Sequence, residues 1–212
     1  MGREELSHVL IAILVVFLVG GFSYFAELLF FPLLQILLFS VIIILVHVLS
    51  KELAAYFFDA RVEHRIWMVS RFGLKEHHHL KEPVPLGALL PLFFSVFSLG
   101  ILKVMPVLTY ETRALRRRAA RRFGIYSYTA MTDWHNGLIG AAGIIGLLIL
   151  SVIAYVGDFE YLAKLAVYYA LANIIPVSSL DGAHIFFGSR IVWSVLAIVV
   201  ALFSLGAFVI LV

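Results

Sequence analysis

Ionisable side chains inside apolar stretches are the residues of this 212-residue chain that could do chemistry. A charge in hydrocarbon costs roughly 2.5–3.5 kcal/mol even on a lenient insertion scale, so such residues usually have partners and a function. His47, Lys51 and Glu52 lie within one apolar stretch, Lys103 lies within another, and Asp181 follows a third. His47 and Lys51 are four residues apart and therefore share one face of a helix. These residue types are suited to ion pairing, acid–base chemistry or metal binding.

Asp181 follows a break in an apolar stretch. The chain reads Asn173-Ile-Ile-Pro176-Val-Ser-Ser-Leu180-Asp181-Gly182 at this point. Proline interrupts a helix and frees a backbone carbonyl, and asparagine can satisfy polar groups near such a break. We therefore expect the carboxylate to be presented at an interrupted helix.

The composition indicates that these residues sit in a membrane protein. Hydrophobic residues make up 63% of the chain, charged residues make up 14%, and the mean hydropathy is +1.04. The apolar residues form blocks of about twenty, the length that crosses roughly 30 Å of hydrocarbon. A soluble helical bundle would need more polar surface. The chain has no cysteine, which excludes disulfides and thiolate metal sites.

The expected fold is a single membrane domain over 1–212, an all-α polytopic protein with a re-entrant segment and a short β element. Five to six transmembrane helices are expected, and the first is a retained helix rather than a signal peptide. Glycines at small-residue spacing in one stretch suit close helix contact. The apolar stretches are 9–31, 33–58, 84–109, 137–157, 161–176 and 191–212.

The segment 84–109 is expected to enter the membrane and return rather than to cross it. Basic residues cluster on both sides of it, and cytoplasmic loops collect Lys and Arg. A re-entrant path puts both clusters on one side, and the prolines in the segment disfavour one straight helix. Loops 60–83 and 110–135 are then cytoplasmic. The Arg-rich part of 110–135 is interpreted as a topology signal rather than a nucleic-acid site, and the run His77–His79 as no metal site.

The stretch 173–182, Asn-x-x-Pro-x-x-x-Leu-Asp-Gly, resembles the second signature of the site-2 protease family of intramembrane zinc metalloproteases. The resemblance covers about residues 35–200. It implies that Asp181 is at a zinc-ligand position and that Asn173 is at a substrate-positioning one, with Pro176, Leu180 and Gly182 as motif residues.

The first signature of that family, His-Glu-x-x-His, would fall on 51–55, which reads Lys-Glu-Leu-Ala-Ala. Lys51 and Ala55 then stand where the family has histidines, and Glu52 keeps the general-base position. A protonated lysine has no lone pair for a metal, so no cofactor is expected, and we predict an ion pair between Lys51 and Asp181 instead. An alternative metal site would use His47 as a substitute ligand with Glu52 and Asp181.

The resemblance and its departures together imply a catalytically inactive relative, a pseudoprotease, that binds transmembrane or extended client segments. Region 62–72 could supply an edge strand for that binding. One alternative is an active intramembrane zinc metalloprotease, so enzymatic activity stays open. A second is a small transporter or channel component, against which the chain shows no symmetry-related broken helices. The expected partners are the lipid bilayer and a client with a transmembrane segment, and no nucleic acid.

Overall fold

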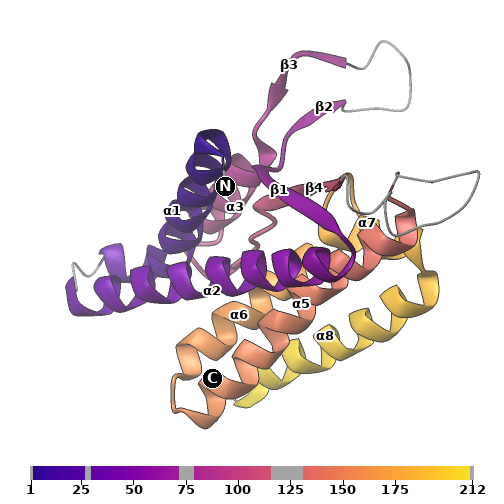
Figure 1. Ribbon diagram of the computed structural model, residues 1–212. Coiled ribbons are helices and arrows are strands. Elements are labelled where there is room, and N and C mark those ends of the chain that lie inside the picture. Colours follow the sequence, from indigo (N-terminus) through magenta and orange to yellow (C-terminus); the bar gives the residue numbers. More distant parts are fainter. Residues whose placement is uncertain (1, 27–29, 72–78, 116–130, 211–212) are drawn as a thin grey trace, which may run out of the picture.

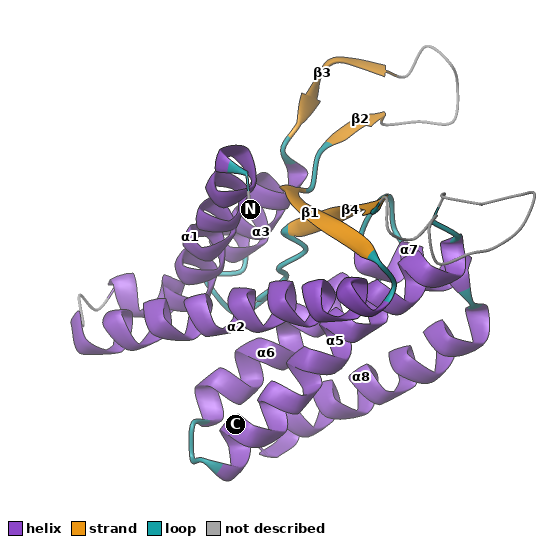
Figure 2. Cartoon of the chain, viewed as in Figure 1, coloured by secondary structure: helices purple, strands orange, loops and turns teal. Residues whose placement is uncertain are grey.

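The computed structural model describes residues 2–26, 30–71, 79–115 and 131–210. Helices dominate it, and two small sheets lie together at one end (Figures 1 and 2). Along the chain the elements are α1 (Arg3–Ala26), α2 (Phe30–Phe57), β1 (Ala60–Ile66), β2 (Val69–Arg71), β3 (His79–Val84), α3 (Leu86–Phe97), β4 (Leu108–Ala114), α5 (Asp133–Val156), α6 (Glu160–Asn173), α7 (Asp181–Gly188) and α8 (Arg190–Ile210).

Four of these helices, α1, α2, α5 and α8, are long and apolar enough to cross a bilayer. By length and composition they indicate a multi-pass integral membrane protein. The expected number of five to six is too high for the described part of the chain. Helices α3 and α6 have 12 and 14 residues, so they extend only about 18 and 21 Å at 1.5 Å per residue. Helix α6 ends at Asn173, shortly before Pro176, as the proline requires.

The segment 84–109 leaves the sheets and returns to them, as the basic clusters on both sides of it predicted. Both ends of the excursion are held by Trp67. The Trp67 N–H donates to Val107 O and the Gly87 N–H donates to Trp67 O, each at 2.9 Å. A Cβ at Gly87 would lie 2.3 Å from Val107 O, so only glycine permits this close approach. The two ends of this segment therefore lie side by side at Trp67.

The β structure is more extensive than the single short element expected. Strand β1 pairs antiparallel with β4, from Ala60 opposite Ala114 to Ile66 opposite Leu108, and β2 pairs with β3. Each sheet has two strands. The description all-α is thus wrong for this end of the molecule, because strand pairing between residues more than 40 positions apart leaves no local signal.

The core of the helical part lies between α1, α2, α5 and α6 and includes Val16, Ile43, Ile144 and Leu165. Large apolar side chains on the outer faces of α2 and α8 are exposed, as expected for surfaces that contact lipid. The loop 60–83 is described only in part, and His77 and His78 lie outside the described residues, as do positions 116–130 of the basic stretch.

Candidate functional site

Three polar side chains converge in the interior between α2 and α7. Lys51 Nζ lies 2.6 Å from Asp181 Oδ1, and His47 Nε2 lies 2.7 Å from Asp181 Oδ2. All three side chains are fully buried. The predicted Lys51–Asp181 ion pair is therefore present, and His47 joins it. An ionised carboxylate only accepts, so His47 donates from Nε2. We call these three residues the buried triad.

Helix geometry and one glycine place the two residues of α2. His47 and Lys51 are one turn apart and project from the same face. They point at α5, where a Cβ on Gly143 would come within 2.7 Å of Lys51 Cε and 2.9 Å of His47 Cδ2. Glycine at position 143 therefore makes room for two large polar side chains between packed helices. The small-residue spacing noted in the sequence serves this approach of α2 to α5.

The helix break after α6 presents the third residue of the triad. Leu180 is extended and buried immediately before α7, and Asp181 is the first residue of that helix. Gly182 packs directly against the end of α6, because a Cβ there would lie 2.0 Å from Ile174 O. The Leu-Asp-Gly sequence thus folds the chain back sharply and directs Asp181 towards α2.

The variant Gly182→Ala is expected to destabilise the protein by at least about 1–3 kcal/mol, because the added methyl group would collide with a backbone carbonyl that cannot rotate away. Thermal unfolding in detergent measures this effect. The matched control is Gly206→Ala in α8, where a Cβ meets nothing within 4 Å and alanine favours the helix. Equal unfolding temperatures for the two variants would contradict the assignment.

Two tyrosines complete the surroundings of the triad. The Tyr110 ring centroid in β4 is 4.5 Å from Lys51 Nζ, and its hydroxyl donates to Asn136 O at 2.6 Å. A desolvated cation over a ring gains about 2 kcal/mol. The Tyr169 ring is edge-on to His47, with centroids 5.1 Å apart. Burial, with the negative charge of Asp181, holds the pKa of Tyr110 well above its ordinary value. Tyr110 therefore lies beside the triad as a neutral side chain.

The buried triad does not fit a catalytic zinc ion. Such an ion needs three protein ligands with free lone pairs at about 2.0–2.2 Å. His47 and Asp181 could supply two of them, but the third position holds the ammonium of Lys51, which has no lone pair while protonated. The positive charge that neutralises Asp181 is thus part of the chain.

The other residues expected in the site are elsewhere. Ala55 is buried in a small apolar cluster with Val62 and Tyr110, one turn beyond Lys51. Glu52 groups with Glu5 and His64, with one ligand atom of each within 4.8 Å of the others. Among the described residues this is the one group of three carboxylate or imidazole ligands so close together. The substitute metal site of His47, Glu52 and Asp181 is therefore not formed, because Glu52 projects from a different side of α2 than His47.

Asn173 has a structural position beside the triad. Its buried side-chain amide donates to Tyr169 O at 2.8 Å and contacts Met105 O at 3.4 Å, so it links α6 to the returning excursion. Pro176 is exposed in the break between α6 and α7. His184 lies in α7 with its ring centroid 4.7 Å from that of Tyr110. Lys103 is separate from the triad and lies over the Tyr161 ring at 5.7 Å.

Four residues near these sites were not singled out from the sequence: Tyr110, Tyr169, Glu5 and His64. The tyrosines look like ordinary apolar-segment residues, and Glu5 looks like an acidic residue of a first helical turn. His64 is fully buried in β1 although it follows a glutamate in a charged segment. Burial, with the nearby charges of Lys51 and His47, lowers the pKa of His64 to about 3. A buried neutral histidine in an otherwise charged strand is visible only once the strand is packed.

Comparisons with protein-family models, with curated proteins and with solved structures give no match.

Proposed function

We propose that this protein binds an extended segment of a membrane client at the free edge of β4 and does not cleave it by a zinc-dependent mechanism. The single observation that carries the proposal is the position of the Lys51 ammonium, 2.6 Å from Asp181 in the buried triad. By the resemblance to the site-2 protease family, residues 51 and 181 are at positions that would bind the catalytic metal ion. A lysine ammonium in place of the metal ion supports the proposal that the chain keeps the fold and lacks zinc-dependent proteolysis.

The hydrogen-bonding pattern of the β1–β4 sheet supports the binding part of the proposal. The Trp67 N–H donates to Val107 O, and the Leu115 N–H donates to Asp59 O. In an antiparallel pair such bonds recur at every second residue. In the register of β1 and β4, the even-numbered residues of β4 therefore direct their backbone groups away from β1. These residues are Leu108 and Tyr110, which are buried, and Thr112 and Ala114, which are partly exposed. The accessible part of this edge is therefore at Thr112 and Ala114.

No described strand pairs with that edge of β4, since its sheet has two strands. The opposite edge, on β1, is covered by α1, where the His64 N–H donates to Glu5 Oε1 at 3.3 Å. A cavity of about 440 Å³ lies over one face of this sheet, lined by Thr109 and Glu111 of β4 together with residues of α1 and β1. Strand addition at an open edge is a common way to bind an extended peptide. The edge strand we propose is thus β4 rather than region 62–72.

In this proposal the sheets lie on the cytoplasmic side. The strands fall largely within the basic segments 60–83 and 110–135, and cytoplasmic loops collect positive charge. The client segment would be the part of a membrane protein that emerges at this surface in extended form.

Client binding is expected to depend on the backbone N–H of Thr112. The variant Thr112→Pro removes that N–H from the open edge and leaves the bonds to β1 in place, since proline is tolerated at such edge positions. A photo-crosslinking amino acid at Glu111, whose side chain is 57% exposed, should capture a membrane protein in cells. We expect Thr112→Pro to reduce the adduct at least about tenfold, the effect of one lost hydrogen bond of roughly 1.4 kcal/mol.

The matched control is Thr112→Ala, which loses the hydroxyl that donates to Asn136 Oδ1 but keeps the backbone N–H. It should retain the adduct. Equal adducts from Thr112→Pro and the parent protein would count against binding at this edge. Zinc-dependent cleavage of a transmembrane substrate by the purified parent protein would support the active alternative instead.

A further inference from the structure

A second polar cluster joins three elements at the sheet end of the molecule. Glu5 comes from the first turns of α1, Glu52 from the last turns of α2, and His64 from β1. One ligand atom of each lies within 4.8 Å of the other two. Glu5 is 7% exposed and His64 is fully buried, while Glu52 is half-buried. Two carboxylates and an imidazole are therefore concentrated in a largely closed space.

The hydrogen bonds within this cluster are weak. Glu5 Oε1 is 3.3 Å from the His64 N–H and 3.4 Å from His64 Nδ1, and Glu5 Oε2 is 3.3 Å from the Gly2 N–H. Normal bonds of this kind are about 2.9 Å long. The other ring nitrogen, His64 Nε2, is buried and has no hydrogen-bond partner in the described part of the chain. The ring is therefore held by a hydrogen bond through Nδ1 alone.

The negative charge of the cluster also lacks an internal counterion. Among the described residues, neither Glu5 nor Glu52 forms an ion pair with a lysine or arginine. Two neighbouring carboxylates repel each other, and burial of an unpaired carboxylate is costly. The buried triad, in contrast, contains its own cation. The cluster therefore has negative charge that a metal cation could neutralise, whereas the triad already contains the ammonium of Lys51.

We propose that Glu5, Glu52 and His64 bind a divalent transition-metal cation, with zinc as the best fit to the ligand set. Carboxylate oxygens and a neutral imidazole are accepted zinc ligands. A tetrahedral ion with bonds of about 2.0–2.1 Å holds its ligand atoms about 3.4 Å apart. Glu5 Oε1 and His64 Nδ1 are already at 3.4 Å. Glu52, half-buried near the end of α2, has a ligand atom within 4.8 Å of both, and metal binding would draw it closer.

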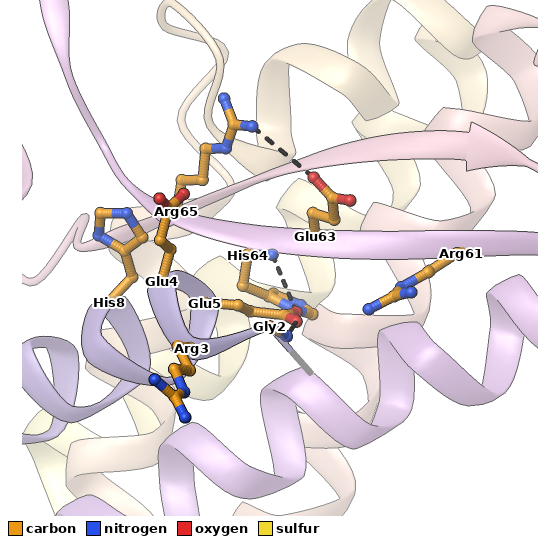
Figure 3. Close-up of a pocket in the computed structure, with 9 residues that line it drawn as sticks. All are labelled: Gly2, Arg3, Glu4, Glu5, His8, Arg61, Glu63, His64 and Arg65. Atoms are coloured by element: carbon orange, nitrogen blue, oxygen red, sulfur yellow. Dashed lines mark hydrogen bonds and ion pairs between the residues drawn. The ribbon is translucent and has the colours of Figure 1, made fainter.

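The cluster is open to solutes from two directions. Figure 3 shows Glu5 and His64 side by side, with Arg61 and Glu63 from the same strand around a cavity of about 390 Å³. A second cavity of about 270 Å³ is lined by Glu5 and Glu52. Glu5 lines both cavities and Glu52 lines the second, so an ion can reach the carboxylates from there, and water can fill the fourth coordination position.

Bound metal would join the start of α1 to the end of α2 and to β1. The contact between Glu5 and the His64 N–H already places α1 over the edge of β1 that is not paired with β4. A metal bond at the same place would hold α1 against the sheet. The site is independent of the proposed client binding at β4.

The test is zinc titration of the metal-stripped full-length protein in detergent, by calorimetry. Every protein in the series carries His77→Asn, His78→Asn and His79→Asn, so that the histidine run contributes nothing. We expect one zinc ion per chain. Glu52→Gln and His64→Ala should each lower the affinity at least about 100-fold, since changes even outside the first ligand shell cost 10–100-fold. Glu52→Gln keeps the shape of a half-buried side chain and so preserves the fold.

The matched control is Glu63→Gln, which changes the residue before His64 on β1 and whose carboxylate pairs with Arg113 instead. Glu63→Gln should keep zinc affinity within about threefold. Absence of stoichiometric zinc in the parent protein, or unchanged affinity in Glu52→Gln, would overturn the proposal.

Discussion

The variant Lys51→His is expected to create a zinc site in the buried triad. It removes the ammonium beside Asp181 and supplies an imidazole one helical turn from His47, the i and i+4 spacing of two histidine ligands on one helix. With Asp181 the site then has three ligands. Measured in a Glu52→Gln background, zinc affinity should rise at least about 100-fold over the parent. X-ray absorption should show two imidazoles bound to the ion.

The matched control is Ala55→His in the same background, which should gain no zinc site because Ala55 packs against Val62 and Tyr110. Zinc binding by Ala55→His, and not by Lys51→His, would contradict the placement of the triad. Metal binding is expected without proteolysis, since Val48 follows His47 where a His-Glu-x-x-His helix has its general base.

The variants Lys51→Met and Asp181→Asn are each expected to destabilise the protein by about 3–5 kcal/mol, because each leaves one buried charge without its partner. The double variant should lose less than the sum of the two single losses, since no unpaired charge is left. Unfolding free energies in mixed detergent micelles give this comparison directly.

The control is Lys81→Met in β3, an exposed lysine whose replacement should change stability by no more than about 0.5 kcal/mol. If the two single losses simply add in the double variant, Lys51 and Asp181 do not stabilise each other, and the ion pair does not contribute to the stability of the fold.

The sequence was sufficient for the parts of the fold that depend on local pattern. Run length and composition predicted the four long apolar helices, and the basic residues on both sides of 84–109 predicted that this segment returns. The Lys51–Asp181 contact was expected from the resemblance, which puts both residues at positions that would share one metal.

The position of the site along α2 was not predictable in the same way. His47, Lys51 and Ala55 lie at i, i+4 and i+8, so all three share one face, and helical periodicity cannot decide which two meet Asp181. The decision comes from α5, where Gly143 leaves room beside His47 and Lys51. That is a property of two packed helices and not of either one.

The Glu5–Glu52–His64 cluster was not predictable either, since its members come from three elements that meet only in the folded chain. The same holds for β4, which pairs with β1 across the whole excursion. In both cases the information is in long-range contacts, which local propensity does not carry.

The hydrogen bonds of Trp67 with Gly87 and Val107 form late in synthesis, because they join residues far apart in the chain. Strand β1 is complete at residue 66, but its partner begins only at residue 108, so the ribosome makes α3 before β1 can pair. Helix α3 is therefore made while β1 still lacks the strand that pairs with it. The hydrogen bond between the Trp67 N–H and Val107 O can form only after residue 107 has been made. A chain that ends before residue 108 would expose β1 as an unpaired strand next to the apolar helix α3, and unpaired strand edges and apolar surface promote aggregation.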